Sequence, residues 1–325
     1  MPQYTYLDSP EFLKLSLHLV TIISTPIYLL GLYCILFKTP DTMKSVKWYL
    51  FTLHSMITLF DYSVSVLTVP YLLIPRVAGI PFGVLRYLGI PTSFQTMFVI
   101  MVLMSVGISS LSIYENRYFI LCDFRRKNQW RVLRRFWLVL HYLYCIVLLL
   151  SVSLTLPNQS PARARLFQNL PCLPDFLYNE PVFVLLESIF PVIALASFII
   201  IIVVELAIFI SQLLINIQLQ RRTARISQKT YQAQKQFLFA LFTQSSIPLV
   251  TLVVPLVYGL GAVFWNYYNQ AAINLCVITV TTHGLIATMV MLWVHKPYRM
   301  AVKGLLEVLD KRRVNVKPLS NSQQQ

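Results

Sequence analysis

The chain has 325 residues, of which 57% are hydrophobic and only 12% are charged, against roughly 45–50% and about 25% in soluble domains. This composition excludes a single soluble globule. The formal net charge of +15 would suit a nucleic-acid-binding protein, but no basic and aromatic module lies outside the apolar stretches, so nucleic acid is not expected as a partner.

Apolar stretches long enough to cross a bilayer as helices, about 20 residues each, recur along the whole chain. They predict seven membrane-spanning helices, at about 15–37, 48–74, 92–121, 136–156, 182–214, 237–262 and 270–294. A transmembrane barrel is excluded because its strands would alternate apolar and polar residues, and these stretches do not. We therefore expect an all-α membrane fold, a single seven-helix domain over residues 1–325.

Polar residues line one face of the second predicted helix. Their spacing of four and three residues places His54, Thr58, Asp61, Ser65 and Thr68 on the same side. Ionisable groups are costly inside a membrane and usually face the interior of a helix bundle. One interpretation is a hydrogen-bonded seam that holds helices together. The other is a ligand, ion or proton-linked switch centred on Asp61.

The third predicted helix ends with ionisable residues after a long uncharged stretch. Glu115 and Arg117 stand two positions apart, so they point away from each other on a helix and each needs another partner. Snorkelling to the membrane surface is the ordinary interpretation. The functional interpretation is a charge clamp from Glu115 to Lys235 or Arg222, which opens when a cytosolic partner inserts. A face of small polar residues on the same helix predicts central packing. It comprises Ser105, Ser109, Ser112 and Asn116.

The sixth and seventh predicted helices carry further polar or bending positions. Pro248 follows Lys235 in the sixth helix, and because proline removes a backbone donor it acts either as a hinge for the inner end or as a plain kink. His283 in the seventh helix lies at a depth similar to that of Asp61. We hypothesise that these two side chains approach each other and that protonation influences the conformational balance.

A short amphipathic helix on the membrane surface is predicted after the seventh span, at about 298–311, followed by a polar tail at 314–325. Its apolar residues share one face while basic residues lie elsewhere. This face comprises Tyr298, Val302, Leu305, Leu306 and Leu309.

The 27 Lys and Arg residues concentrate in alternate segments, which follow the first, third, fifth and seventh helices. The exceptions are Lys14, Arg76, Arg86, Arg163 and Arg165. By the positive-inside rule this distribution predicts an extracellular amino terminus and a cytosolic carboxyl terminus. The basic segments are then expected to contact anionic lipid of the inner leaflet. The sequon Asn158-Gln159-Ser160 falls in a loop that this orientation places outside, so Asn158 is a candidate for glycosylation.

Catalytic and metal-binding patterns are absent from the sequence. The cysteines include no C-x-x-C and the histidines form no H-E-x-x-H, so we expect neither a metal site nor a cofactor. The sequence contains no G-x-S-x-G and no P-loop, which argues against an enzyme. A transporter or ligand-gated cation channel is the alternative, because Asp61 and Glu205 are intramembrane acids. No internal repeat of the kind common in transporters accompanies them.

Seven stretches, in this order and spacing, resemble the nematode serpentine chemoreceptors of class h, within the Str group. They are TPIYLLGLYCILFKTP (25–40), MKSVKWYLFTLHSMITLFDY (43–62), VPYLLIPRVAGIPFGVL (69–85), YENRYFIL (114–121), LPCLP (170–174), QKQFLFALFTQSSIPL (234–249) and HKPYR (295–299). The resemblance extends from about residue 20 to about residue 305.

This resemblance implies a G-protein-coupled receptor that detects environmental chemicals at the plasma membrane of chemosensory neurons. The Glu115-Asn116-Arg117 tract occupies the place of the acid–arginine motif of rhodopsin-like receptors, with an additional Asn116 between acid and arginine. The helix after the seventh span resembles the eighth helix of such receptors. The residues expected to act in coupling to a heterotrimeric G protein are Glu115, Asn116, Arg117, Tyr118, Lys235, Pro248, Pro297 and Tyr298.

A small-molecule ligand is expected between the outer halves of the third, fifth, sixth and seventh helices. Candidate lining residues, chosen for depth and chemistry, are Phe94, Gln95, Phe98, Glu187, Tyr258 and Trp265. A mostly apolar pocket of this kind suits small volatile or amphiphilic molecules.

Overall fold

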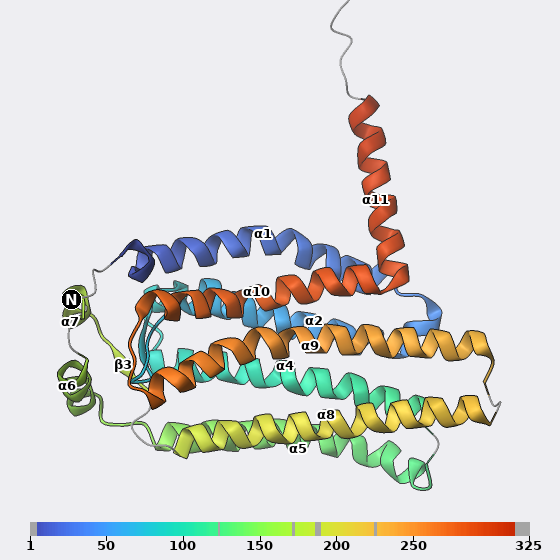
Figure 1. Ribbon diagram of the computed structural model, residues 1–325, viewed down its shortest axis with the longest axis horizontal. Coiled ribbons are helices and arrows are strands. Elements are labelled where there is room, and N and C mark those ends of the chain that lie inside the picture. The colour runs from blue at the N-terminus through green and yellow to red at the C-terminus, as the bar shows by residue number, and fades with distance from the viewer. Residues whose placement is uncertain (1–4, 123, 171–172, 186–189, 224–225, 316–325) are drawn as a thin grey trace, which may run out of the picture.

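The computed structural model describes residues 5–122, 124–170, 173–185, 190–223 and 226–315. Long helices run side by side in an elongated bundle (Figure 1). They are α1 (Pro10–Phe37), α2 (Lys44–Tyr62), α4 (Thr92–Leu121), α5 (Lys127–Leu154), α8 (Phe190–Arg222), α9 (Gln228–Phe264) and α10 (Gln270–Val294). Among the described residues, six helices are long and apolar enough to cross a membrane, and α9 adds the apolar helical stretch Val250–Phe264. The expected all-α membrane bundle is confirmed.

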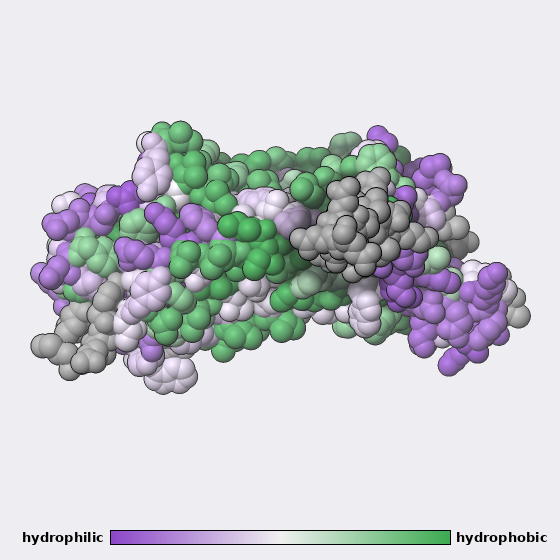
Figure 2. Space-filling view, turned by 90° about the horizontal axis from the view of Figure 1, so that it is seen from above, coloured by the Kyte–Doolittle hydropathy of each residue, from purple (hydrophilic) through white to green (hydrophobic). Residues whose placement is uncertain are grey.

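Two helices occupy the centre of the bundle. Helix α4 packs against α2, α5 and α8, and α10 packs against α1, α2 and α9. The small-residue face of α4 permits this close packing, since Ser105, Ser109 and Ser112 are all buried and each donates its hydroxyl to a carbonyl of the preceding turn. On the face seen in Figure 2, apolar side chains form a band across the middle of the molecule, with hydrophilic residues at both ends. This band has the distribution expected of a bundle that lies in lipid.

One end of the bundle carries a small antiparallel sheet of β1 (Pro70–Leu73), β2 (Ala78–Pro81) and β3 (Phe183–Val184), in the order β1-β2-β3. Tyr71 pairs with Ile80, and Ala78 pairs with Val184. The short helices α3 (Val84–Tyr87), α6 (Gln159–Asn169) and α7 (Phe176–Asn179) lie in the connections around this sheet. We call it the sheet end, and we call the opposite end, which carries Arg117, the basic end.

The sheet corrects the expected bounds of two spans. The second was expected to continue to 74, but α2 passes into a π-helical stretch, η3 (Ser63–Thr68), and strand β1 begins at Pro70. Val69 adopts a left-handed conformation with φ 43°, and Pro70 has no backbone donor, so the helix cannot continue. The fifth span was expected from 182, where β3 lies instead. The fourth helix begins at Lys127, earlier than the expected 136.

The amino-terminal segment is fastened to the sheet end. A 3-10 turn, η1 (Tyr6–Asp8), precedes α1, and Asp8 accepts hydrogen bonds from the backbone of Ala271 (2.8 Å) through its side chain and from the Tyr71 hydroxyl (2.7 Å) through its carbonyl. Asn274 donates its amide to the Leu7 carbonyl at 2.8 Å. These bonds tie the chain before α1 to both β1 and the start of α10.

The basic end leads into helix α11 (Lys296–Asn315), which leaves the bundle at a steep angle (Figure 1). The expected amphipathic helix at 298–311 lies within it, while residues 316–325 of the expected polar tail lie outside the described part of the chain. Leu305, Leu306 and Val308 are exposed on α11. Tyr298 is fully buried at its start and shares a hydrogen bond of 2.8 Å with the Thr39 hydroxyl.

Candidate functional site

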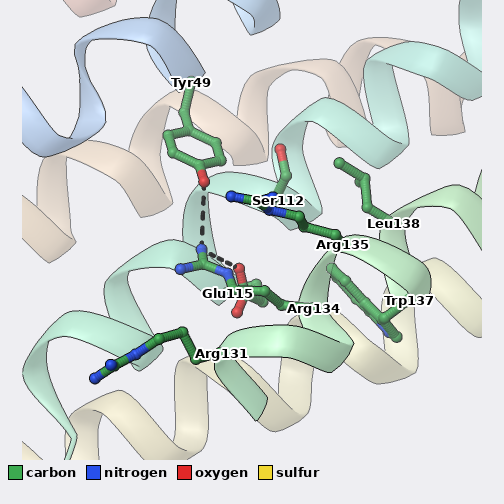
Figure 3. A pocket seen from close by; sticks show the side chains of 8 residues that line it. All are labelled: Tyr49, Ser112, Glu115, Arg131, Arg134, Arg135, Trp137 and Leu138. Carbon is green, nitrogen blue, oxygen red and sulfur yellow. Dashed lines mark hydrogen bonds and ion pairs between the residues drawn. The ribbon is translucent and has the colours of Figure 1, made fainter. Parts of the chain in front are cut away.

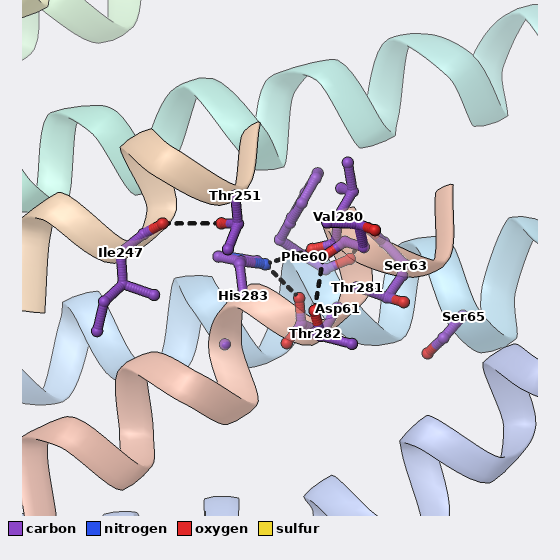
Figure 4. Close-up of polar contacts among 12 residues, drawn as sticks. Phe60, Asp61, Ser63, Ser65, Ile247, Thr251, Val280, Thr281, Thr282 and His283 are labelled. Atoms are coloured by element: carbon purple, nitrogen blue, oxygen red, sulfur yellow. Dashed lines mark hydrogen bonds and ion pairs between the residues drawn. The ribbon is translucent and has the colours of Figure 1, made fainter. Parts of the chain in front are cut away.

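The buried face of α2 meets α1 and α10 in a polar cluster around Asp61 (Figure 4). The side chain of Asp61 is 5% exposed and that of His283 is fully buried, and His283 Nδ1 lies 2.9 Å from Asp61 Oδ1. The same nitrogen lies 2.8 Å from the Val280 carbonyl oxygen. Because both neighbours of Nδ1 are acceptors, this nitrogen carries the proton. Tyr28 on α1 donates its hydroxyl to the other carboxylate oxygen of Asp61.

Two glycines allow these helices to approach each other closely. A Cβ on Gly284 would collide with Asp61 Oδ2 and would lie 2.7 Å from Ile57 Cγ2. A Cβ on Gly31 of α1 would lie 2.9 Å from the ring of His54, and that ring is 3.0 Å from the Tyr28 carbonyl oxygen through Nε2. The absence of side chains on these glycines therefore brings α1, α2 and α10 together at the depth of Asp61.

The remaining members of the predicted polar face on α2 also point inward. Ser65 is buried and accepts a hydrogen bond of 2.8 Å from Thr21 on α1, and Thr68 donates to the Ser63 carbonyl. Thr58 is half-buried, and its hydroxyl has no hydrogen-bond partner among the described residues. The hypothesised approach of His283 to Asp61 is present in the structure, whereas a switching role for the pair stays a prediction.

Glu115 forms its ion pair with a residue that the sequence did not suggest. Arg134 on α5 lies 2.7 Å away (Figure 3). The Trp130 indole donates to the second carboxylate oxygen at 2.7 Å. The expected clamp to Lys235 or Arg222 is wrong, because both residues are exposed on α9 and α8 and the neighbour that faces Glu115 on α4 is α5. The side chain of Glu115 is only 3% exposed.

Asn116 belongs to the same group. Its amide nitrogen donates to the Ser45 carbonyl at 3.1 Å, and its amide oxygen accepts from Arg134 at 3.1 Å. Through these bonds Asn116 connects α4 to both α2 and α5. The residue that separates acid and arginine in the tract therefore acts in helix packing.

Arg117 faces the other side of α4. Its guanidinium carbon lies 3.8 Å from the ring centre of Phe237 on α9, a cation–π contact, and its Nε is buried without a hydrogen-bond partner among the described residues. The ring of His295, directly after α10, lies 5.7 Å from that of Phe237 in a tilted arrangement. Burial, together with the positive charge of Arg117, lowers the pKa of His295 to about 4, so His295 is neutral near pH 7.

The other predicted coupling residues lie on α4, α9 and α11. Tyr118 stacks on Phe124 with ring centres 5.0 Å apart, and Lys235 is exposed two residues before Phe237. Pro297 lies in the first turn of α11, next to the buried Tyr298. The backbone of Pro248 is helical within α9, and its side chain lies outside the described part of the structure.

The predicted ligand residues do not form a single lining. Phe94 is 60% exposed and Trp265 75% exposed on the surface of the bundle, so for these two the prediction of an inward-facing side chain is wrong. Both lie near the sheet end, where an exposed aromatic ring suits the membrane interface. Gln95 is buried and donates its amide to the Ile90 carbonyl. Glu187 lies outside the described residues.

Two further ligand candidates, in addition to the buried Gln95, face inward. Phe98 packs against the apolar core. Tyr258 is half-buried, and its hydroxyl oxygen has no hydrogen-bond partner among the described residues. An unpaired buried hydroxyl is available to a polar group of a ligand. Asn158, the glycosylation candidate, is exposed at the sheet end, directly before the first residue of α6.

Sequence reasoning missed the partners that come from distant parts of the chain. Tyr28, Arg134, Trp130 and Phe237 were not selected, because aromatic and arginine residues are common in membrane helices and nothing in their spacing points to a particular neighbour. A second intramembrane pair was also missed, between His141 on α5 and Glu205 on α8 at 3.3 Å. The described residues contain no group of His, Cys, Asp and Glu that could hold a metal ion.

Comparisons with known proteins agree with this arrangement of helices. The family model described as the serpentine type 7TM GPCR chemoreceptor Srh matches residues 8–308. Serpentine receptor class H-72 of Caenorhabditis elegans is 26% identical to this chain over 331 aligned positions, which cover 99% of the chain and 93% of that protein. The matched region runs from the amino-terminal turn into α11.

Proposed function

We propose, from the premise that this chain belongs to the Srh family of serpentine seven-transmembrane chemoreceptors, that it binds a small molecule at the sheet end and activates a heterotrimeric G protein at the basic end. The protein is a multi-pass membrane protein of a G-protein-coupled receptor family. The ligand and the coupling to a G protein are our proposals. So are its place in the plasma membrane and its expression in chemosensory neurons.

The proposed orientation follows from the distribution of charge. Arginines cluster at the basic end of the bundle, on α5, at the end of α8 and in the first turn of α11, among them Arg131, Arg135, Arg221, Arg222 and Arg299. The positive-inside rule assigns such an end to the cytosol. The sheet end, where Asn158 is exposed, would then face the exterior, and both the ligand and any glycan would be accessible there.

The observation that carries the proposal is the contact between Arg117 and Phe237. Among the described residues, the buried Arg117 has no hydrogen-bond partner for its Nε, and its guanidinium lies against an aromatic ring of helix α9. Displacement of the basic end of α9 would remove this ring and open Arg117 to a cytosolic partner. A ligand that binds more tightly to the displaced state would shift the population toward it, by no more than its difference in affinity for the two states.

The proposed receptor also contains an element that can bend. Helix α9 carries Pro248 between the Phe237 contact and the sheet end. Proline removes a helical hydrogen bond, so the basic end of α9 can swing while its other half stays packed. The hinge interpretation of Pro248 thus fits the proposed displacement of Phe237.

The test is a reporter assay for calcium or cyclic nucleotides in cells that express the receptor, screened against a chemical panel. We expect Arg117→Ala to abolish the agonist response at equal surface expression, and Arg222→Ala, which removes an exposed arginine at the same end, to preserve it. Phe237→Ala should raise basal activity by roughly 2- to 30-fold, since a cation–π contact stabilises by about 0.5–2 kcal/mol.

A full agonist response from Arg117→Ala would contradict the role given to Arg117. An agonist-dependent cation current in cells that lack G-protein signalling would instead favour the alternative function, a ligand-gated channel.

A further inference from the structure

A cavity of about 250 Å³ opens at the basic end between α2 and α5 (Figure 3). Helix α2 contributes Tyr49, α4 contributes Ser112 and Glu115, and α5 contributes the remaining lining residues, among them Arg131 and Arg135. Because α2 and α5 both pack on α4, α4 forms the floor of the cavity and the other two helices form its walls. None of this belongs to the Arg117 contact on the opposite face of α4.

The lining carries more positive charge than its own acid can balance. Arg134 is paired with Glu115 at 2.7 Å and also donates to the Tyr49 hydroxyl at 3.3 Å. Arg131 and Arg135 are exposed, and neither has an acidic partner within ion-pair distance among the described residues. Within the described part of the chain, two guanidinium groups therefore stand unneutralised at a cavity that is also lined by the hydroxyls of Tyr49 and Ser112.

The depth of the cavity is that of the boundary between headgroups and acyl chains. Arg131 and Arg135 lie four and eight residues after the first residue of α5, about 6 and 12 Å along the helix at about 1.5 Å per residue. Leu138 extends the lining toward the apolar middle of the bundle. Trp48, beside Tyr49 on α2, is 64% exposed, and Phe136 on α5 is 63% exposed. Tryptophan is enriched at the headgroup level of membranes.

We propose that this cavity binds the phosphate headgroup of an anionic phospholipid. Arg131 and Arg135 donate to the phosphate oxygens, a geometry that the guanidinium fork suits better than an ammonium group. The hydroxyls of Tyr49 and Ser112 complete the polar lining, and the acyl chains lie along the exposed apolar face of α5. The assignment of this lipid to the inner leaflet rests on the orientation proposed above, but the site itself does not.

A phospholipid bound in this cavity would stabilise the packing of α2, α4 and α5, and α4 carries the Arg117 that contacts Phe237. Its phosphate would join α5 to α2 across the floor formed by α4, next to the ion pair of Glu115 with Arg134. Basic pockets between helices on the cytosolic side of membrane proteins are suited to anionic headgroups. Lipid composition would thereby influence the packing of α4, on which Arg117 is carried.

The test measures binding directly on the purified full-length protein in detergent. The fluorescence anisotropy of a labelled short-chain phosphatidic acid is followed in titrations, with unlabelled phosphatidic acid, phosphatidylcholine and glycerol phosphate as competitors. The variant is the double substitution Arg131→Gln with Arg135→Gln. The control is Arg125→Gln with Arg126→Gln, which removes the same charge from exposed positions outside the cavity.

We expect the cavity variant to lose roughly 30-fold in affinity, as two arginines at an anionic surface imply, and the control to change by less than about threefold. A second variant, Leu138→Trp, fills the cavity without altering charge and should also weaken binding. Equal losses in the cavity and control variants, or no saturable binding to the wild type, would overturn the proposal. Displacement by glycerol phosphate as effective as by phosphatidic acid would show a site for a soluble anion instead. Because neither agonist nor G protein takes part, failure here leaves the receptor proposal standing.

Discussion

The pair of Asp61 and His283 offers the sharpest test of how the interior of the helix bundle is held together. Both side chains are nearly inaccessible, at 5% and 0% exposure, and lie 2.9 Å apart. Removing one partner of a buried charged pair costs about 3–5 kcal/mol, because the other is left uncompensated. We therefore expect Asp61→Asn and His283→Ala each to be strongly destabilising when made alone.

The double variant separates coupling from simple loss of packing. Once both partners are replaced, no uncompensated ionisable group remains, so the double variant should be more stable than the sum of the single effects by about 0.5–3 kcal/mol. Thermal unfolding in detergent can be followed with a dye that fluoresces on reaction with buried thiols such as Cys34 and Cys145.

A matched cycle pairs Asp61→Asn with His141→Ala. His141 contacts Glu205 on α8 at 3.3 Å, a different pair on different helices, so this cycle should be additive within about 0.5 kcal/mol. Strict additivity in the Asp61 and His283 cycle would refute the coupling. The same set of variants assayed for signalling would show whether the pair also influences the active state.

Two further predictions concern single positions. Gly284→Ala would push its new methyl group into Asp61 and should destabilise the receptor by about 1–3 kcal/mol. The control, Gly304→Ala on α11, places a Cβ where nothing lies within 4 Å and should be neutral or slightly stabilising. Equal melting temperatures of the two purified variants would contradict the packing argument. His295 has a pKa of about 4 in the folded protein and about 6.5 when exposed in the unfolded chain. Between about pH 4 and about 6.5 the unfolded state therefore binds more protons than the folded state. The free energy of unfolding accordingly falls as the pH drops from about 6.5 toward about 4, by up to about 3 kcal/mol. His295→Phe should flatten this part of the melting profile, and an unaltered profile in His295→Phe would reject the assignment.

The long apolar helices could be read from the chain alone. The bounds expected for α4 and α10 coincide with those observed, 92–121 and 270–294, because each stretch is predominantly apolar and bounded by polar or proline residues. The inward face of α2 was equally accessible to sequence reasoning, since a spacing of three and four places residues on one side of a helix whatever surrounds it. Membership in a receptor family followed from ordered motifs in the same way.

The sheet end shows where a purely apolar criterion failed. The stretch after Thr68 is hydrophobic enough to extend the second span, and the structure turns it into the strands β1 and β2. Pro70, Pro75 and Pro81, together with Gly79, were the available signal, because prolines and glycines in close succession mark turns more reliably than hydropathy marks helix ends.

Partners between helices were decided by the tertiary structure. Sequence spacing showed that Glu115 and Arg117 cannot pair with each other, but only the tertiary structure assigns Arg134 on α5 to the first and Phe237 on α9 to the second. Periodicity determines which side of a helix a residue occupies and carries no information about which neighbour covers that side. Lipid solvation determined the helices along this chain, whereas the close packing permitted by residues such as Gly284 determined which of them meet.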